Sequence, residues 1–275
     1  MNQASPAIKL EFGTSQRLTS ERMKKSPFLS KLVHTVFGYT NIGNWARSLV
    51  VIKLFKRLPL QDFKKIMDVG AGLGEFSFML SKALPDVQIT ALEIWKERAE
   101  ILKETVKKGG FTNVTVYDNY IETLPGQGTY DFIFAIDVFE HIWENEMPFK
   151  ACYDKLKPGG RLLVKIPNIT QINIFPQKFF KEHQDWLDDE HVGQVYDLDG
   201  LAARFEKEGF AIEYKAYSDG WFSRLGWELG YFSKKGGPVT QLLFLPLCKL
   251  CVHIDRMFGS NLKKGNAIQV IGVKK

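Results

Sequence analysis

Short apolar runs alternate with amphipathic segments through the middle of the chain. Runs rich in β-branched and aromatic residues predict strands, whereas apolar residues at every third or fourth position predict helices. The predicted strands are 65–69, 88–92, 114–117, 130–136, 161–166, 210–217 and 267–273. The predicted helices are 75–84, 96–108, 150–156 and 198–208. This alternation predicts an α/β fold in which helices cover both faces of a doubly wound, mostly parallel sheet.

Three segments fall outside the alternation. Residues 1–59 predict an N-terminal helical arm or lid ahead of a domain that spans residues 60–275. Residues 168–197 and 218–266 interrupt the regular order late in the chain. Because insertions at the loop ends of a doubly wound sheet usually shape its ligand pocket, we expect both insertions to form a cap over the substrate.

Composition adds two constraints. The net charge of +6 favours anionic partners. The three cysteines, Cys152, Cys248 and Cys251, do not suggest a disulfide framework, and the first residues lack a secretory signal pattern, so we expect a cytoplasmic protein. Cys248 and Cys251 lie in an apolar run without a second cysteine pair, which favours small core residues over zinc ligands.

A glycine-rich turn joins the first predicted strand to the first predicted helix. Gly70, Gly72 and Gly74 allow a tight turn and let a ligand approach the backbone at the start of a helix. A dinucleotide-binding turn would need glycine where Glu75 stands, and an acidic side chain there would face a pyrophosphate. The turn therefore suits a ligand without phosphates.

An acidic residue, Glu93, ends the second predicted strand. A carboxylate about 20 residues beyond such a turn can accept hydrogen bonds from both ribose hydroxyls. Strand, glycine turn, helix, strand and acid in this order resemble the class I S-adenosylmethionine-dependent methyltransferases. The stretches that carry the resemblance are Ile66–Gly74, Ala91–Glu93, Val114–Asp118, Tyr130–Ile142 and Leu156–Val164.

The resemblance implies a seven-stranded sheet whose last strand, 267–273, runs antiparallel, and it implies S-adenosylmethionine as cofactor. The glycines would line the methionine and ribose part, Asp68 would lie near the amino-acid end, and Asp137 would lie beside the methionine and the substrate. Asp118 would contact the adenine, a role that neighbouring residues could share because this segment is longer than usual. The implied cofactor residues are Asp68, Gly70, Gly72, Gly74, Glu93, Asp118, Asn119, Tyr120 and Asp137.

Catalysis needs little beyond alignment of the acceptor behind the methyl carbon, and no metal is expected. A hydroxyl acceptor also needs a base. His141 follows the strand 130–136 at the carboxyl edge of the sheet, where it is either that base or a packing residue beneath the cofactor. His191 and Glu190, in the first insertion, form a second candidate pair.

The acceptor is the least constrained part of the prediction. Residues 45–60 and 238–258 mix apolar and basic positions, so they are either helices packed on the sheet or interfacial helices on anionic lipid. Residues 238–258 fall short of the ~18 uninterrupted apolar residues of a spanning helix. Tyr196, Gly209 and the long second insertion give a looser likeness to methyltransferases of bacterial glycan, lipid and natural-product pathways.

The expected function is therefore O-methylation of a small-molecule, glycan or lipid-like acceptor, with peripheral membrane contact as an open alternative. An RNA methyltransferase fits the basic charge, but no RNA-binding module or stripe of interleaved basic and aromatic residues is present, so a nucleic-acid partner is not expected. A non-catalytic cofactor-binding scaffold is the third interpretation. The sequence does not indicate an oligomeric state.

Overall fold

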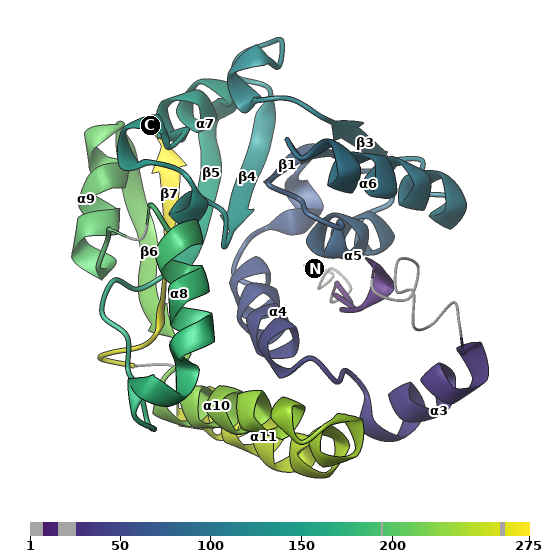
Figure 1. The fold of residues 1–275 in the computed structure, drawn as a ribbon. Coiled ribbons are helices and arrows are strands. Elements are labelled where there is room, and N and C mark those ends of the chain that lie inside the picture. Colours follow the sequence, from purple (N-terminus) through teal and green to yellow (C-terminus); the bar gives the residue numbers. More distant parts are fainter. Residues whose placement is uncertain (1–7, 16–25, 194, 259–261) are drawn as a thin grey trace, which may run out of the picture.

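The computed structural model describes residues 8–15, 26–193, 195–258 and 262–275. Its centre is a seven-stranded sheet with the order β3-β2-β1-β4-β5-β7-β6 (Figure 1). β7 runs antiparallel to β5 and β6, and the other pairs are parallel, which confirms the predicted fold class. The strands are β1 (Lys65–Val69), β2 (Gln88–Leu92), β3 (Val114–Tyr117), β4 (Tyr130–Ile136), β5 (Leu156–Pro167), β6 (Phe210–Ser218) and β7 (Ala267–Lys274).

Helices cover both faces of this sheet. The side chains of β4 alternate between the two faces, as the period of a strand requires: Phe132 and Phe134 join the core on one side, and Ile133 and Ala135 join the core on the other. α4, α5 and α6 contribute to the first core, and α7 and α9 to the second. The helices are α3 (Pro27–Phe37), α4 (Ile42–Phe55), α5 (Glu75–Ala83), α6 (Lys96–Gly109), α7 (Phe149–Lys155), α8 (Lys181–Glu190), α9 (Leu198–Lys207), α10 (Trp221–Lys235) and α11 (Pro238–Phe258).

α4 is part of this core, although the sequence places it in an N-terminal arm. Its last residue, Phe55, is fully buried and packs edge-to-face on Phe132 and Phe134, with ring centroids 5.8 and 5.1 Å apart. The last part of the predicted arm, residues 1–59, therefore packs against the sheet. The apolar positions of α4 are too evenly spread along the helix to show which side faces the sheet.

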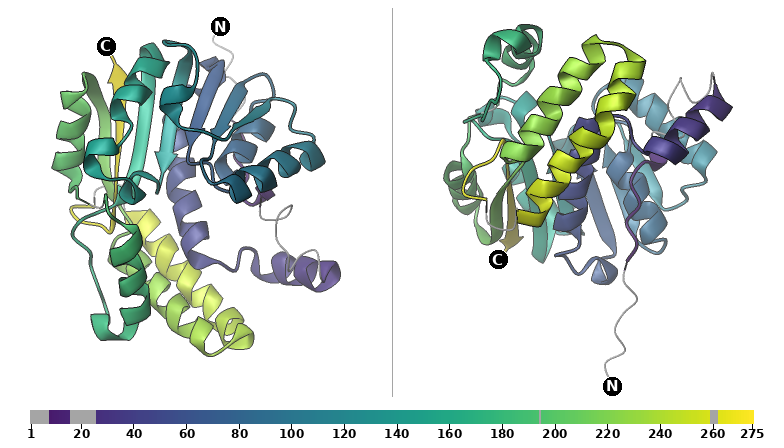
Figure 2. Two further views of the ribbon diagram at one scale, coloured as in Figure 1. Left: turned by 45° about the horizontal axis from the view of Figure 1, so that its top comes forward. Right: turned by 90° about the horizontal axis from the view of Figure 1, so that it is seen from below.

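Both late insertions leave the same edge of the sheet. Pro167, at the end of β5, and Ser218, at the end of β6, each pair with Ala267 at the start of β7. This is the edge at which the parallel strands β1 to β4 also end. α8 from the first insertion and α10 and α11 from the second extend beyond that edge together with α4 (Figure 2).

α10 and α11 form an antiparallel pair with a close contact. A Cβ atom at Gly226 would lie 2.6 Å from the carbonyl oxygen of Cys248 and 3.1 Å from Cβ of Cys251. Both cysteines are buried free thiols on the side of α11 that faces α10. They are core residues, as the apolar surroundings in the sequence predict.

Candidate active site

The turn between β1 and α5 holds three glycines, and each has a backbone conformation or a close contact that favours glycine. Gly70, Gly72 and Gly74 all have positive φ angles, of 71°, 57° and 77°. A Cβ atom at Gly70 would lie 2.5 Å from the side chain of Val138, and one at Gly74 would lie 2.5 Å from that of Leu102. At Gly72 a Cβ atom would meet nothing within 4 Å. Gly72 therefore leaves its backbone open to a ligand, as a cofactor turn requires.

Glu93, which directly follows β2, is hydrogen-bonded to this turn. Its side chain is buried, and its two carboxylate oxygens accept hydrogen bonds from the backbone N–H groups of Gly72 at 2.8 Å and Trp95 at 2.9 Å. A carboxylate has about four lone-pair sites, so two further hydrogen bonds can still be accepted. Two ribose hydroxyls would fit this remaining capacity.

Asp68 supports the turn from the last part of β1. Its carboxylate is buried and accepts a hydrogen bond from Oγ of Ser77 in α5 at 2.7 Å. Burial raises the pKa of Asp68 to about 7, against the hydrogen bond from Ser77, and the nearby carboxylate of Glu93 raises it further. Asp68 thus ties the first turn of α5 to the strand below the glycines.

A cavity of about 690 Å³ opens beside the turn, within the range usual for small-molecule sites. Its wall is largely apolar, and among the residues predicted to hold adenine it includes Tyr120. Asp118 pairs with Lys103 at 2.7 Å, and the side chain of Asn119 accepts a hydrogen bond from the backbone N–H of Tyr120. The apolar wall residues, which the sequence analysis did not single out, are Val69, Leu92, Ile94, Ile121, Val138, Ile142, Met147, Pro148 and Ala151.

Asp137 begins a row of paired charges at the carboxyl edge of the sheet. It has a positive φ of 53°, uncommon outside glycine, and its carboxylate contacts Lys165 of β5 at 2.9 Å and Arg47 of α4 at 2.6 Å. Lys165 also lies 3.9 Å from Asp219. Burial opposes ionisation of Asp137, but Lys165 and Arg47 hold its pKa below the usual value. The sequence predicts Asp137 at this edge but not its cationic partners, which come from distant segments.

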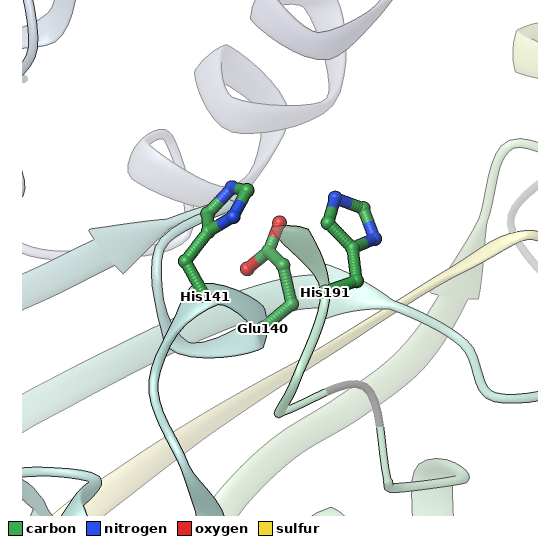
Figure 3. Close-up of side chains that lie close together, drawn as sticks. All are labelled: Glu140, His141 and His191. Carbon is green, nitrogen blue, oxygen red and sulfur yellow. The ribbon is translucent and has the colours of Figure 1, made fainter. Parts of the chain in front are cut away.

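The predicted catalytic residues lie together next to this row. The rings of His141, in the short helix after β4, and His191, after α8, meet edge-to-face with centroids 4.9 Å apart. Nδ1 of His141 lies 2.9 Å from the carbonyl oxygen of Glu190 and donates a hydrogen bond to it when protonated. Figure 3 shows the carboxylate of Glu140 between the two rings.

Glu140 is the member of this cluster that the sequence analysis did not propose. It is 1% exposed, and its Oε2 atom has no hydrogen-bond partner among the described residues. Burial, and then the carboxylate of Asp137, raise the pKa of Glu140 well above its usual value. Its position directly before His141 was the one sign in the sequence that Glu140 belongs to the site. Its burial next to His191 depends on how the first insertion packs, which the sequence does not show.

Comparisons with known proteins agree with this arrangement. A family model described as a methyltransferase domain matches residues 45–215. The ubiquinone/menaquinone biosynthesis C-methyltransferase UbiE of Haemophilus ducreyi is 23% identical over 154 residues, which are 53% of this chain and 60% of that enzyme. A tRNA U34 carboxymethyltransferase of Desulfotalea psychrophila is 26% identical over 57% of this chain and 48% of that enzyme.

Solved structures give the same fold. The phosphoethanolamine N-methyltransferase 2 of Haemonchus contortus, in complex with S-adenosyl-L-methionine, superposes with a TM-score of 0.61 at 18% identity, covering 96% of this chain and 60% of that one. The family match covers more than half of the chain, and the glycine turn, Glu93 and the open backbone at Gly72 fit the cofactor. The protein therefore belongs to the class I S-adenosylmethionine-dependent methyltransferases.

Proposed function

We propose that the protein transfers a methyl group from S-adenosylmethionine to a hydroxyl oxygen of a small, lipid-like acceptor. The observation that carries the proposal is the cluster of Glu140, His141 and His191 at the carboxyl edge of the sheet. Val138, three residues before His141, packs close to Gly70 of the cofactor turn. The cluster therefore lies where an acceptor would meet the cofactor.

Bound S-adenosylmethionine supplies an electrophilic methyl group on a sulfonium. Attack by the acceptor oxygen on this methyl group would leave S-adenosylhomocysteine, and His141 would take up the proton of the acceptor hydroxyl. Glu93 and the glycine turn fix the cofactor, and the cluster around His141 receives the acceptor hydroxyl. A hydroxyl acceptor needs a base to remove its proton. The histidines of the cluster are candidate bases, which supports oxygen as the acceptor atom.

The surface of α11 supports a lipid-like acceptor. Among the helices in the described ranges, α11 alone has the length and mean hydropathy of a membrane-crossing helix, although charged residues interrupt its apolar run, and 28% of its apolar window is buried. Its outer side carries exposed apolar residues at helical spacing, and the exposed side of α3 does the same. These residues, here named the apolar face, are Val239, Leu243, Leu247, Leu250 and Met257 of α11 with Phe28, Leu32 and Val36 of α3.

The charges around the apolar face match an anionic lipid surface. The acidic residues of α10 and of the described part of α11, Glu228 and Asp255, are buried, whereas Lys234, Lys235 and Arg256 are exposed. An apolar helix face bordered by cations binds in the interface of an anionic bilayer without spanning it. Nζ of Lys249 donates to the carbonyl oxygen of Phe37, so α3 and α11 are linked in the structure.

The test combines acceptor classes in one assay. Protein and methyl-labelled S-adenosylmethionine are incubated with hydroxylated lipids in phosphatidylglycerol vesicles, with soluble phenols and sugars, and with RNA. We expect label in the lipid fraction as a methyl ether. Label in RNA would instead support the RNA alternative, and S-adenosylhomocysteine binding without turnover on any acceptor would support a scaffold.

A further inference from the structure

We propose that Glu140, His141 and His191 bind a divalent transition-metal ion. One potential ligand atom from each side chain lies within 4.8 Å of the other two. Ligand atoms about 2.1 Å from a common ion are separated by about 3 to 4 Å, so small side-chain movements bring these three atoms into a coordination sphere. Figure 3 shows Glu140 and both rings on the same side of the chain segments that carry them.

The unpartnered oxygen of Glu140 is an independent reason for an ion at this place. Oε2 is buried and has no hydrogen-bond partner in the described parts of the chain. A buried carboxylate oxygen without a partner is costly, and native structures seldom keep one without an ion or water. A cation between the two imidazole rings would satisfy this oxygen.

The surroundings of His141 also suit a metal ligand. Its Nδ1 lies 2.9 Å from the carbonyl oxygen of Glu190, and a donated hydrogen bond there leaves the lone pair of Nε2 available. Metal-bound histidines usually donate their second ring N–H to a carbonyl or carboxylate oxygen in this way. Glu190 directly precedes His191, so the same segment orients one ligand and supplies another.

The charges of the site decide which kind of ion it would hold. Asp137 and Asp219 are matched by Arg47 and Lys165. The carboxylates left to balance an ion are therefore Glu140, within the cluster, and Glu190, whose Oε2 lies 3.9 Å from Nδ1 of His141. Two neutral imidazoles and one carboxylate around a divalent ion leave a net positive charge and open coordination positions. Imidazole donors favour zinc, iron or cobalt over magnesium, and such a ligand set keeps positions open for an oxygen ligand.

The ion would have two consequences. It would join the first insertion, through His191, to the short helix after β4 that carries Glu140 and His141. It would also bind the acceptor hydroxyl and ease the loss of its proton to solvent water, so that His141 would act as a metal ligand in place of a base. This second role rests on the proposed function, whereas metal binding itself does not.

The experiment measures binding of Co²⁺ and Zn²⁺ to untagged full-length protein that has been freed of metal with EDTA. We expect one Co²⁺ per chain with a visible ligand-field spectrum, displaced by Zn²⁺, and at least about tenfold weaker affinity in Glu140→Gln and in His191→Ala. His183→Ala is the matched control, because His183 lies on the neighbouring α8 and packs against Trp227. It should bind Co²⁺ as the wild type does.

Calorimetry with S-adenosylhomocysteine on the same samples separates this proposal from the proposed function. Co²⁺ binding without cofactor binding would sustain the metal site and count against the methyltransferase. Should Glu140→Gln fail to fold, His191→Ala still decides the question, because His191 is only partly buried. Unchanged Co²⁺ affinity in His191→Ala, or no ligand-field spectrum in the wild type, would overturn the metal site.

Discussion

Replacing Asp68 by asparagine should remove a pH dependence that this one carboxyl group imposes on folding. Burial raises the pKa of Asp68 from 3.8 to about 7 in the folded protein. The unfolded chain therefore releases this proton near pH 3.8, while the folded chain keeps it to about pH 7. The contribution of Asp68 to stability is complete below pH 3.8 and is lost as the pH rises through 7.

The size of the effect follows from the shift. One pKa unit corresponds to about 1.4 kcal/mol, so a rise of about three units sets an upper limit of about 4 kcal/mol on the stability lost between acid and neutral pH. Asparagine keeps an oxygen that accepts the hydrogen bond from Ser77 and has no proton to release. The free energy of unfolding of Asp68→Asn should therefore rise relative to that of the wild type as the pH increases.

Urea unfolding followed by tryptophan fluorescence, at several pH values from about 5 to 8, measures this difference. Asp131→Asn is the control. The pKa of Asp131 is lowered because Lys157 and the backbone of Lys64 and Lys65 outweigh its burial, so it stays ionised throughout this range. Its effect should not vary with pH. A constant difference between Asp68→Asn and the wild type across this range would show that the pKa of Asp68 is not raised in the folded protein.

Three further substitutions test the site and the apolar face. Gly72→Ala is paired with Gly110→Ala as a control, because each places a methyl group at positive φ with open space around it. Both variants should lose about 1 kcal/mol of stability. Calorimetry should show weaker S-adenosylhomocysteine binding only for Gly72→Ala. His141→Gln should lower turnover about 100- to 10,000-fold and leave cofactor affinity unchanged; a variant that keeps most of its activity would make His141 a packing residue. Leu243→Glu puts a charge on the apolar face and should abolish sedimentation with phosphatidylglycerol vesicles. Glu97→Ala, on α6 outside the apolar face, is the control and should sediment as the wild type does. Equal sedimentation of the two variants would exclude the apolar face as a lipid contact.

The cofactor turn could be predicted from the sequence because its signals are local. Gly70, Gly72 and Gly74 follow a buried strand directly, and Glu93 ends the next strand, so strand order alone places them at one edge. The same reasoning placed His141 at this edge. Turn geometry and strand order depend on neighbouring residues, which a single sequence displays.

The rest of the site depends on contacts between distant segments. Arg47 pairs with Asp137 because α4 packs on the sheet, and the sequence does not show that packing. Glu140 meets His191 because the first insertion returns to the end of β4. Asp118, which is predicted to contact the adenine, forms an ion pair with Lys103, and Tyr120, which is predicted to share that role, lines the cavity. The apolar face likewise depends on a distant contact. α10 packs against one side of α11, which leaves the apolar residues on the opposite side exposed.

Binding of S-adenosylhomocysteine to the wild type and to Glu93→Ala decides whether the glycine turn and Glu93 hold the cofactor. Glu93 fastens Gly72 and offers its remaining lone pairs to the ribose, so calorimetry should show binding that Glu93→Ala weakens by about 1–3 kcal/mol. Glu97→Ala, an exposed glutamate on α6, should bind as the wild type does. Tight binding of NAD with no response to S-adenosylhomocysteine would show that the turn holds a dinucleotide and not S-adenosylmethionine.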